Sequence, residues 1–148
     1  MNPAPWVPPP ALALLLAALG HLLDGLFPQL PHPSLPTFGL LLLADALTLA
    51  ITAWVSFWRL GTTVLPHGTP TALVTGGPYR WTRNPMYLAL STALWGFAFY
   101  IGGLVAYLAP LAFHFLIDRW HIPFEEARLS ALFGADYARY RQRVPRWL

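Results

Sequence analysis

Four apolar segments joined by short polar connections constrain the fold of this chain more than any other feature. They cover residues 11–27, 37–58, 85–101 and 104–120. A helix needs about 20 residues, within a range of about 17–25, to cross a bilayer. The second segment meets this length easily, and the other three lie at its lower limit. The pattern predicts an all-α integral membrane protein with about four transmembrane helices.

The composition agrees with a membrane setting. Apolar residues make up 56% of the 148 residues and charged residues only 10%, whereas a typical soluble domain has about 25% charged residues. The length predicts a single membrane domain over residues 1–148, with two spans in residues 1–60 and the remaining elements in residues 61–148. The chain has no cysteine, which excludes disulfides, thiolate metal sites and cysteine nucleophiles.

Helix-breaking residues separate the segments. Four prolines between residues 28 and 36 divide the first segment from the second, and Gly102-Gly103 divides the third from the fourth. The glycine pair predicts a tight turn, so that the third and fourth spans form a helical hairpin. The first segment lacks a basic n-region and is followed by Pro28 instead of a small-residue cleavage site, so we do not expect a signal peptide.

The arginines predict the orientation. If all four segments cross, all nine arginines lie on one side, because three fall between the second and third segments, Arg119 stands at the end of the fourth, and five follow it. The positive-inside rule makes that side cytoplasmic. We therefore expect a multi-pass protein of the cell inner membrane with both termini in the cytoplasm. Its formal charge of +3 suits the anionic membrane surface, and no hydrophilic basic domain is present to bind nucleic acid.

Two polar motifs stand beside these apolar segments. Residues 76–87 read Gly-Gly-Pro-Tyr-Arg-Trp-Thr-Arg-Asn-Pro-Met-Tyr, and the pair Glu125-Glu126 follows the fourth segment. Ionisable groups against a bilayer are costly and are usually kept for function, so the motifs indicate a polar site at a membrane face. Two simpler interpretations stay open. The arginines and aromatics suit interfacial anchors, and the glutamates suit a helix start after Pro123.

Both motifs resemble those of a known superfamily. Gly77-Pro78-Tyr79-Arg80 with Arg83-Asn84-Pro85-Met86-Tyr87 is similar to the Arg-His-Pro-x-Tyr-x-Gly motif of isoprenylcysteine carboxyl methyltransferases. With Asn84 in place of histidine, it is more similar still to the Asn-Pro-Met-Tyr stretch of phosphatidylethanolamine N-methyltransferases. The closing pattern of the superfamily is matched by Glu125-Glu126, Leu129, Phe133-Gly134, Tyr137, Tyr140 and Val144-Pro145-Arg146.

The resemblance implies a multi-span membrane enzyme that uses S-adenosylmethionine. It also implies a cofactor pocket at the cytosolic face, formed by the third and fourth spans and the C-terminal segment. Two departures from the pattern are visible. Ala89 replaces the glycine that ends the motif, and Ile122-Pro123-Phe124 stands where the carboxyl methyltransferases carry an arginine. Arg119, one helical turn earlier, is the candidate replacement.

The chemical groups of this cofactor suggest roles for the residues. Arg80 or Arg83 suits the carboxylate through a two-pronged contact, and either glutamate suits the ribose hydroxyls or the ammonium. Aromatic faces suit the adenine or the sulfonium, and an amide both donates and accepts. The predicted cofactor-binding residues are Tyr79, Arg80, Asn84, Pro85, Tyr87, Glu125 and Glu126, and the predicted catalytic residues are Arg83 and Arg119.

The tail after residue 123 has apolar positions at helical spacing with basic residues on the other face. Gly134 is expected to divide it into two short amphipathic helices lying against the membrane. A plain surface anchor is the simpler alternative.

Further polar residues lie within the apolar segments. His114, Asp118 and His121 share one helix face at i, i+4 and i+7. We expect a packing stripe or a face of the site there, because no further ligand is placed for a metal. The same two roles, packing or substrate contact, apply to His21, Asp24 and Asp45.

Together these features predict an S-adenosylmethionine-dependent methyltransferase acting on a lipid or lipophilic small molecule that enters from the bilayer. Two alternatives stay open at this point. One is an NADPH-dependent membrane reductase of the sterol-reductase type. The other is a non-catalytic membrane protein that binds lipid or acts as a scaffold.

Overall fold

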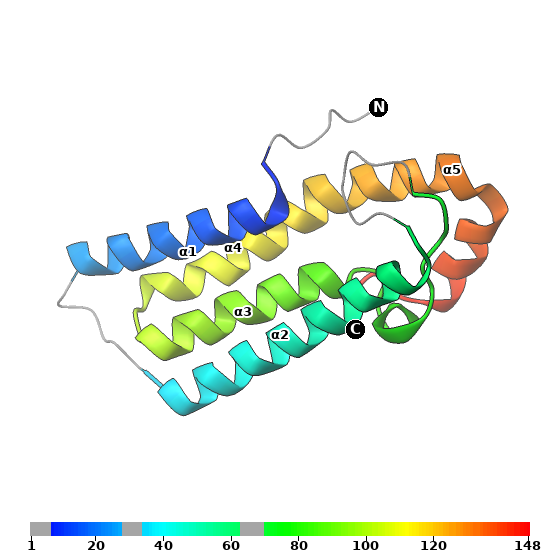
Figure 1. Cartoon of the computed structure of the whole chain (residues 1–148). Helices are drawn as coiled ribbons and strands as arrows, with labels where there is room; N and C mark the ends of the chain where they lie inside the picture. The colour runs from blue at the N-terminus through cyan, green and yellow to red at the C-terminus, as the bar shows by residue number, and fades with distance from the viewer. Residues whose placement is uncertain (1–6, 28–33, 63–69) are drawn as a thin grey trace.

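The computed structural model describes residues 7–27, 34–62 and 70–148, and every regular element in these ranges is a helix. The α-helices pack as a bundle (Figure 1). They are α1 (Pro9–Leu26), α2 (Pro36–Arg59), α3 (Pro85–Ile101), α4 (Leu108–Leu116) and α5 (Ile122–Arg143). The short 3₁₀-helices η1 (Gly77–Arg80) and η2 (Val105–Tyr107) and the π-helix η3 (Ile117–His121) lie between them. The all-α class predicted from the sequence is confirmed.

Helices α1 and α2 are long and apolar enough to cross a membrane. Only 22% of the apolar window of α1 and 17% of that of α2 is buried within the protein. Large apolar side chains of both helices face outward instead, including Leu14, Leu22, Leu41, Leu47 and Trp54. Water-soluble monomers rarely expose continuous apolar surfaces of this extent. The outward-facing apolar surfaces of α1 and α2 are those expected of an all-α membrane protein. α3 is apolar but shorter, at 17 residues.

The fourth apolar segment differs from its prediction. Instead of one helix ending at residue 120, it forms η2, α4 and η3 and then continues into α5 without a break (Figure 1). Pro123 has no N–H to bond the carbonyl of Arg119, four residues earlier. The π-helix contains Arg119 and widens the turn directly before this proline. The helix can therefore continue, and the polar tail extends it.

Small residues let α2 and α3 approach closely. Gly39, Ala46 and Ala53 are the buried residues of α2. A β-carbon on Gly39 would lie 2.7 Å from the carbonyl oxygen of Gly96 in α3, and one on Gly96 would lie 2.9 Å from that of Gly39. Backbone contacts of this kind are typical of membrane helices, where lipid provides no hydrophobic drive for association. The packing holds the end of α2 beside η1.

The chain reverses after α3 in a turn that is tied to α1. Gly102 ends α3 in the left-handed conformation, with φ 76°, and α4 then returns alongside α3 and α1 (Figure 1). The buried carboxylate of Asp24 accepts hydrogen bonds from the backbone N–H groups of Val105 (2.8 Å) and Ala106 (2.9 Å). A β-carbon on Gly103 would overlap this carboxylate. Asp24 therefore joins α1 to η2, and both of its oxygens are used there.

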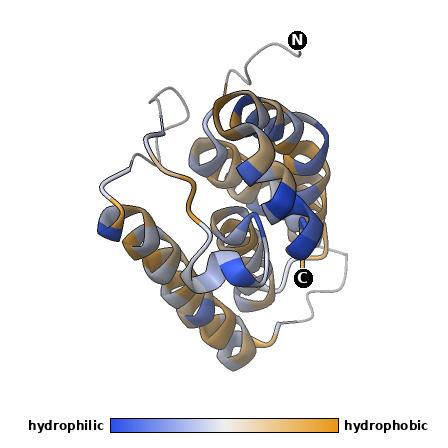
Figure 2. Ribbon diagram, turned by 90° about the vertical axis from the view of Figure 1, so that its right-hand side faces the viewer, coloured by the Kyte–Doolittle hydropathy of each residue, from blue (hydrophilic) through white to orange (hydrophobic). Residues whose placement is uncertain are grey.

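A sharp bend divides α5. Gly134 has φ 46° and ψ −117°, outside the helical region, which confirms the predicted division of the tail. Left-handed φ values favour glycine, so the bend occurs at the glycine of this segment. The second half of α5 turns back toward η1 (Figure 1). Figure 2 looks at this end of the bundle and shows hydrophilic ribbon gathered near the C-terminus.

Candidate functional site

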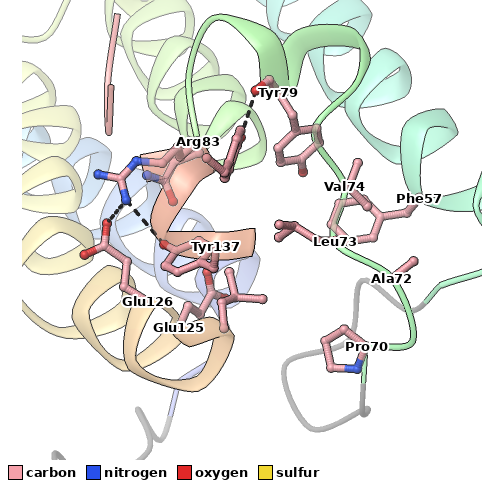
Figure 3. Close-up of a pocket in the computed structure, with 13 residues that line it drawn as sticks. Phe57, Pro70, Ala72, Leu73, Val74, Tyr79, Arg83, Glu125, Glu126 and Tyr137 are labelled. Atoms are coloured by element: carbon pink, nitrogen blue, oxygen red, sulfur yellow. Dashed lines mark hydrogen bonds and ion pairs between the residues drawn. The ribbon is translucent and has the colours of Figure 1, made fainter. Parts of the chain in front are cut away.

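A small cavity lies where the connection between α2 and α3 meets α5 (Figure 3). Its volume is about 80 Å³. Its walls come from the end of α2, residues 70–74, the motif that begins with η1, and both halves of α5. The lining residues are Phe57, Pro70, Ala72, Leu73, Val74, Tyr79, Arg83, Asn84, Glu125, Glu126, Leu129, Tyr137 and Tyr140. Segments far apart in the sequence therefore form one polar site.

A buried ion pair lies in the wall of this cavity (Figure 3). Arg83 Nη1 lies 2.7 Å from Glu126 Oε1, and the two side chains are only 11% and 13% exposed. The same Nη1 donates a hydrogen bond to the hydroxyl of Tyr137 at 3.3 Å. Arg83 Nε is buried without a hydrogen-bond partner. An ion pair this deep is weak evidence for stability because removing both charges from water costs free energy, so the pair invites a functional explanation.

A second arginine holds the other side of Glu126. Arg146 Nη2 donates to Glu126 Oε2 at 2.8 Å, and Arg146 Nε donates to Oε1 at 3.3 Å. Arg146 Nη1 also contacts Asp118 Oδ1 at 3.1 Å. The hydrogen bonds to Glu126 are the main cause that raises the pKa of Arg146 above its usual value. Glu126 thus lies between two guanidinium groups.

The neighbouring carboxylate has a different partner. Glu125 Oε1 accepts a hydrogen bond from the hydroxyl of Tyr87 at 2.6 Å. Burial raises the pKa of Glu125 above its usual value, and the hydrogen bond from Tyr87 opposes this rise. Both members of the predicted glutamate pair therefore have specific side-chain partners. A carboxylate that merely favours the start of α5 would not require such partners.

The motif around residue 84 is held by the C-terminal residues. Asn84 Nδ2 donates to the carbonyl oxygen of Arg146 at 2.9 Å, and Thr82 Oγ1 donates to the same oxygen at 2.8 Å. The backbone N–H of Arg83 donates to the carbonyl of Pro145 at 3.0 Å. These hydrogen bonds fix the backbone around Arg83, and the backbone in turn sets the direction of the Arg83 side chain.

Tyrosines close the opposite side of the cavity. The ring of Tyr79 meets that of Phe57 edge to face, with centroids 5.4 Å apart. The carbonyl of Tyr79 accepts a hydrogen bond from the hydroxyl of Tyr140 at 2.8 Å. Burial raises the pKa values of Tyr79 and Tyr140 above the usual value. Both hydroxyls therefore keep their protons at neutral pH.

The cavity brings together five of the nine residues predicted to form the site, namely Tyr79, Arg83, Asn84, Glu125 and Glu126. Tyr87 lies one hydrogen bond away, through Glu125. The other three do not line the cavity. Arg80 is exposed at the end of η1, and Pro85 is buried at the start of α3. Arg119 is exposed, with its guanidinium carbon 5.5 Å from the centre of the Phe115 ring.

Four further side chains lie in or beside the site without being among the predicted site residues. Leu129, Tyr137, Tyr140 and Arg146 belong to the closing pattern of the superfamily, but the sequence predicted no cofactor contact for them. In the structure, Tyr137, Tyr140 and Val144 are buried together with Leu73, Leu129 and Phe133 packed against them. The bend at Gly134 therefore folds Tyr137, Tyr140 and Val144 onto the protein, where the sequence predicted contact with the membrane. The hydroxyl groups of the two tyrosines, on an otherwise apolar face, were the sequence feature that could have indicated contact with the protein.

The remaining polar candidates contact other parts of the protein. The ring of His114 lies 4.4 Å from that of Trp147, and Asp118 accepts a hydrogen bond from Trp147 Nε1 at 2.9 Å. His121 Nε2 lies 2.9 Å from the carbonyl oxygen of Val7. His21 meets the ring of Phe97 edge to face at 6.4 Å, and Asp45 is exposed on α2. Within the described ranges, no group of three or more potential ligands is arranged to hold a metal ion.

The apolar helices and the charged cavity at one end of them define a membrane protein with a small polar site. The chain belongs to the phospholipid methyltransferase family, whose pattern it matches over residues 35–136, more than half of its length. This confirms the superfamily resemblance inferred from the two motifs.

Three relatives carry the similarity further. Protein-S-isoprenylcysteine O-methyltransferase B of Arabidopsis thaliana is 33% identical over 147 residues, covering 91% of this chain and 71% of that protein. An uncharacterized protein of Haemophilus influenzae is 38% identical over 63 residues, which are 43% of this chain and all of that protein. Methanethiol S-methyltransferase 1 of Bradyrhizobium diazoefficiens is 32% identical over 78 residues, or 53% of this chain and 26% of that protein. No solved structure matches the chain.

Proposed function

We propose that this protein transfers a methyl group from S-adenosylmethionine to a lipid or lipophilic small molecule. The observation that carries the proposal is the cavity with the buried Arg83–Glu126 ion pair at the end of helices with outward-facing apolar surfaces. The family assignment and the two named methyltransferase relatives support methyl transfer as the reaction class. The names of those two relatives specify different acceptor atoms, an oxygen and a sulfur.

The side chains around the cavity suit the chemical groups of this cofactor. Arg83 offers its unpartnered Nε and its Nη groups to a carboxylate. Glu125 and Glu126 offer acceptors for hydroxyl or ammonium groups, and three tyrosine rings offer faces to an adenine or a sulfonium. The residues present therefore fit the cofactor by charge and by hydrogen bonding.

The cavity is too small to admit the cofactor without a change in the positions of its walls. About 80 Å³ is below the range of about 300–1,000 Å³ that is usual for ligand pockets. Binding must therefore separate the walls, and the Arg83–Glu126 contact lies between them. A ligand with both a carboxylate and an ammonium would replace the attraction that this separation removes. Closure of the walls around it would then exclude water from the site.

The cofactor and the protein have different roles in this reaction. The bound cofactor supplies an electrophilic methyl group on a sulfonium. The chain itself binds and orients the reactants, since in-line displacement depends mainly on positioning. Arg83 is the proposed catalytic residue, and Tyr79, Asn84, Glu125 and Glu126 are the proposed cofactor-binding residues. The roles predicted for Arg80, Pro85, Tyr87 and Arg119 stay predictions.

The proposed arrangement in the membrane has four spans, with α3 and the α4–η3 segment forming the second pair. All nine arginines of the chain then lie on one side, which favours a cytosolic site and cytosolic termini. A lipophilic acceptor would reach the site sideways from the bilayer, while the cofactor would enter from the cytosol.

Cofactor binding tests the proposal directly. Calorimetry on the protein purified in detergent should show binding of S-adenosylhomocysteine and much weaker binding of NADPH. Transfer of tritiated methyl groups into total membrane lipids should then depend on the protein. NADPH binding without S-adenosylhomocysteine binding would favour a reductase. Binding of neither compound, with no label transferred, would favour a lipid-binding scaffold.

Thiol labelling tests the orientation, because the natural chain has no cysteine. Ser34 precedes α2, and Thr75 lies just before η1; both are exposed. In intact cells, an impermeant maleimide should label Ser34→Cys and should not label Thr75→Cys. Permeabilised cells provide the control, since both positions should then react. Labelling of Thr75→Cys alone in intact cells would reverse the orientation and place the cavity outside the cytosol.

A further inference from the structure

The C-terminal strap, defined here as residues 144–148, crosses the motif that carries Arg83. The strap's carbonyl groups accept hydrogen bonds from the backbone of Arg83 at 3.0 Å, from Thr82 at 2.8 Å and from Asn84 at 2.9 Å. Two of these three bonds end on the carbonyl of Arg146. The backbone of Arg146 is therefore fixed relative to Arg83. The strap also lies beyond residues 35–136, where the family pattern matches.

The side chain of Arg146 bridges two carboxylates on the helix that runs from α4 to α5. It contacts Glu126 at 2.8 and 3.3 Å and Asp118 at 3.1 Å. Asp118 also accepts a hydrogen bond from Trp147, whose ring lies against His114. The strap is thus attached at two successive residues through the same Asp118 oxygen. Asp118 belongs to the π-helix η3, a distortion that is frequent at functional sites.

Arg146 does not line the cavity, whereas Glu126 does. Contacts from Arg83 on one side and Arg146 on the other restrict the rotation of the Glu126 carboxylate. If Arg83 turned toward a ligand, Glu126 would still be held by Arg146. If Arg83 were its only partner, the Glu126 carboxylate would be free to rotate once that ion pair opened. Arg146 therefore holds Glu126 both when Arg83 contacts it and when Arg83 contacts a ligand.

We propose that Arg146, itself held by Asp118, is a positioning residue that keeps Glu126 directed toward the cofactor. The proposal rests on the function proposed above. An exposed ion pair would contribute little, but the Glu126 side chain is only 13% exposed and Arg146 is 33% exposed. Two nitrogens of Arg146 donate charge-assisted hydrogen bonds to the Glu126 carboxylate and fix its orientation, which the single ammonium of a lysine cannot do. Arg146 and Glu126 should therefore act as one unit in ligand binding.

A double-mutant cycle tests this coupling through the affinity for S-adenosylhomocysteine. Arg146→Gln should weaken binding by about tenfold in the natural background, within the range for residues in contact. In the Glu126→Gln background, Arg146→Gln should cause no further loss. Arg146→Lys should restore only part of the affinity. Arg143→Gln is the matched control, because Arg143 is exposed on the same tail, outside the cavity, and should bind as the natural protein does.

The outcomes separate the two proposals. Equal losses from Arg146→Gln in both backgrounds would overturn the positioning role, and so would unchanged affinity in the natural background. If Arg146→Gln fails to fold, Asp118→Asn takes its place in the same cycle, because it keeps Arg146 but removes its ion pair with Asp118. Failure of the natural protein to bind S-adenosylhomocysteine would overturn the proposed function, and the positioning role would fall with it.

Discussion

Arg83→Ala is expected to abolish methyl transfer and to weaken cofactor binding by about 1.5–3 kcal/mol, the range for hydrogen bonds to charged groups. The guanidinium is the cation in the cavity wall, and its Nε has no partner within the protein. Glu126 would keep its contacts with Arg146, so we expect the bundle to remain folded. Calorimetry and a tritium transfer assay would measure the two losses, and circular dichroism would check the fold.

The control for this experiment is Arg59→Ala. Arg59 is exposed at the end of α2 and does not line the cavity. It carries the same charge at the end of the helix that precedes this connection, so a general loss of positive charge would affect both variants alike. If Arg59→Ala reduced turnover as strongly as Arg83→Ala, both arginines would be interfacial anchors, and the active-site role of Arg83 would be wrong.

Gly103→Ala is expected to cause a large loss of stability, about 2–6 kcal/mol for two N–H groups that lose their acceptor. The added β-carbon would overlap the carboxylate of Asp24, which must then move away from Val105 and Ala106. Each N–H group left unpaired in a buried position costs about 1–3 kcal/mol. Thermal unfolding in detergent would show a lower midpoint, and the association of α1 with η2 would be weakened.

Two variants show whether the effect arises from this contact. Gly25→Ala adds the same methyl group one residue after Asp24, where no atom lies within 4 Å, and should change stability little. In an Asp24→Ala background, Gly103→Ala should cost much less, because the overlapping carboxylate is gone. An unfolding midpoint for Gly103→Ala equal to that of the natural protein would show that the turn adapts without loss.

The sequence determined the elements and the family because these depend on local chemistry. Segment length and hydropathy gave the helices α1, α2 and α3 to within a few residues, and the single glycine in the tail gave the bend in α5. The motif with Arg83 and Asn84 and the glutamate pair were recognisable because residue types and their spacing can be read along the chain. These two motifs also supply the polar residues at the centre of the cavity.

The tertiary structure decided which surfaces meet. Helical spacing placed Tyr137 and Tyr140 on one face, but only the reversal at Gly134 turned that face onto Leu73 instead of the membrane. The same reversal brings Arg146 to Glu126, twenty positions away in the sequence. Arg119, which the sequence places closer to the glutamates, is exposed instead. Periodicity fixes the neighbours of a residue on its own helix, whereas its partners on other segments depend on the path of the whole chain.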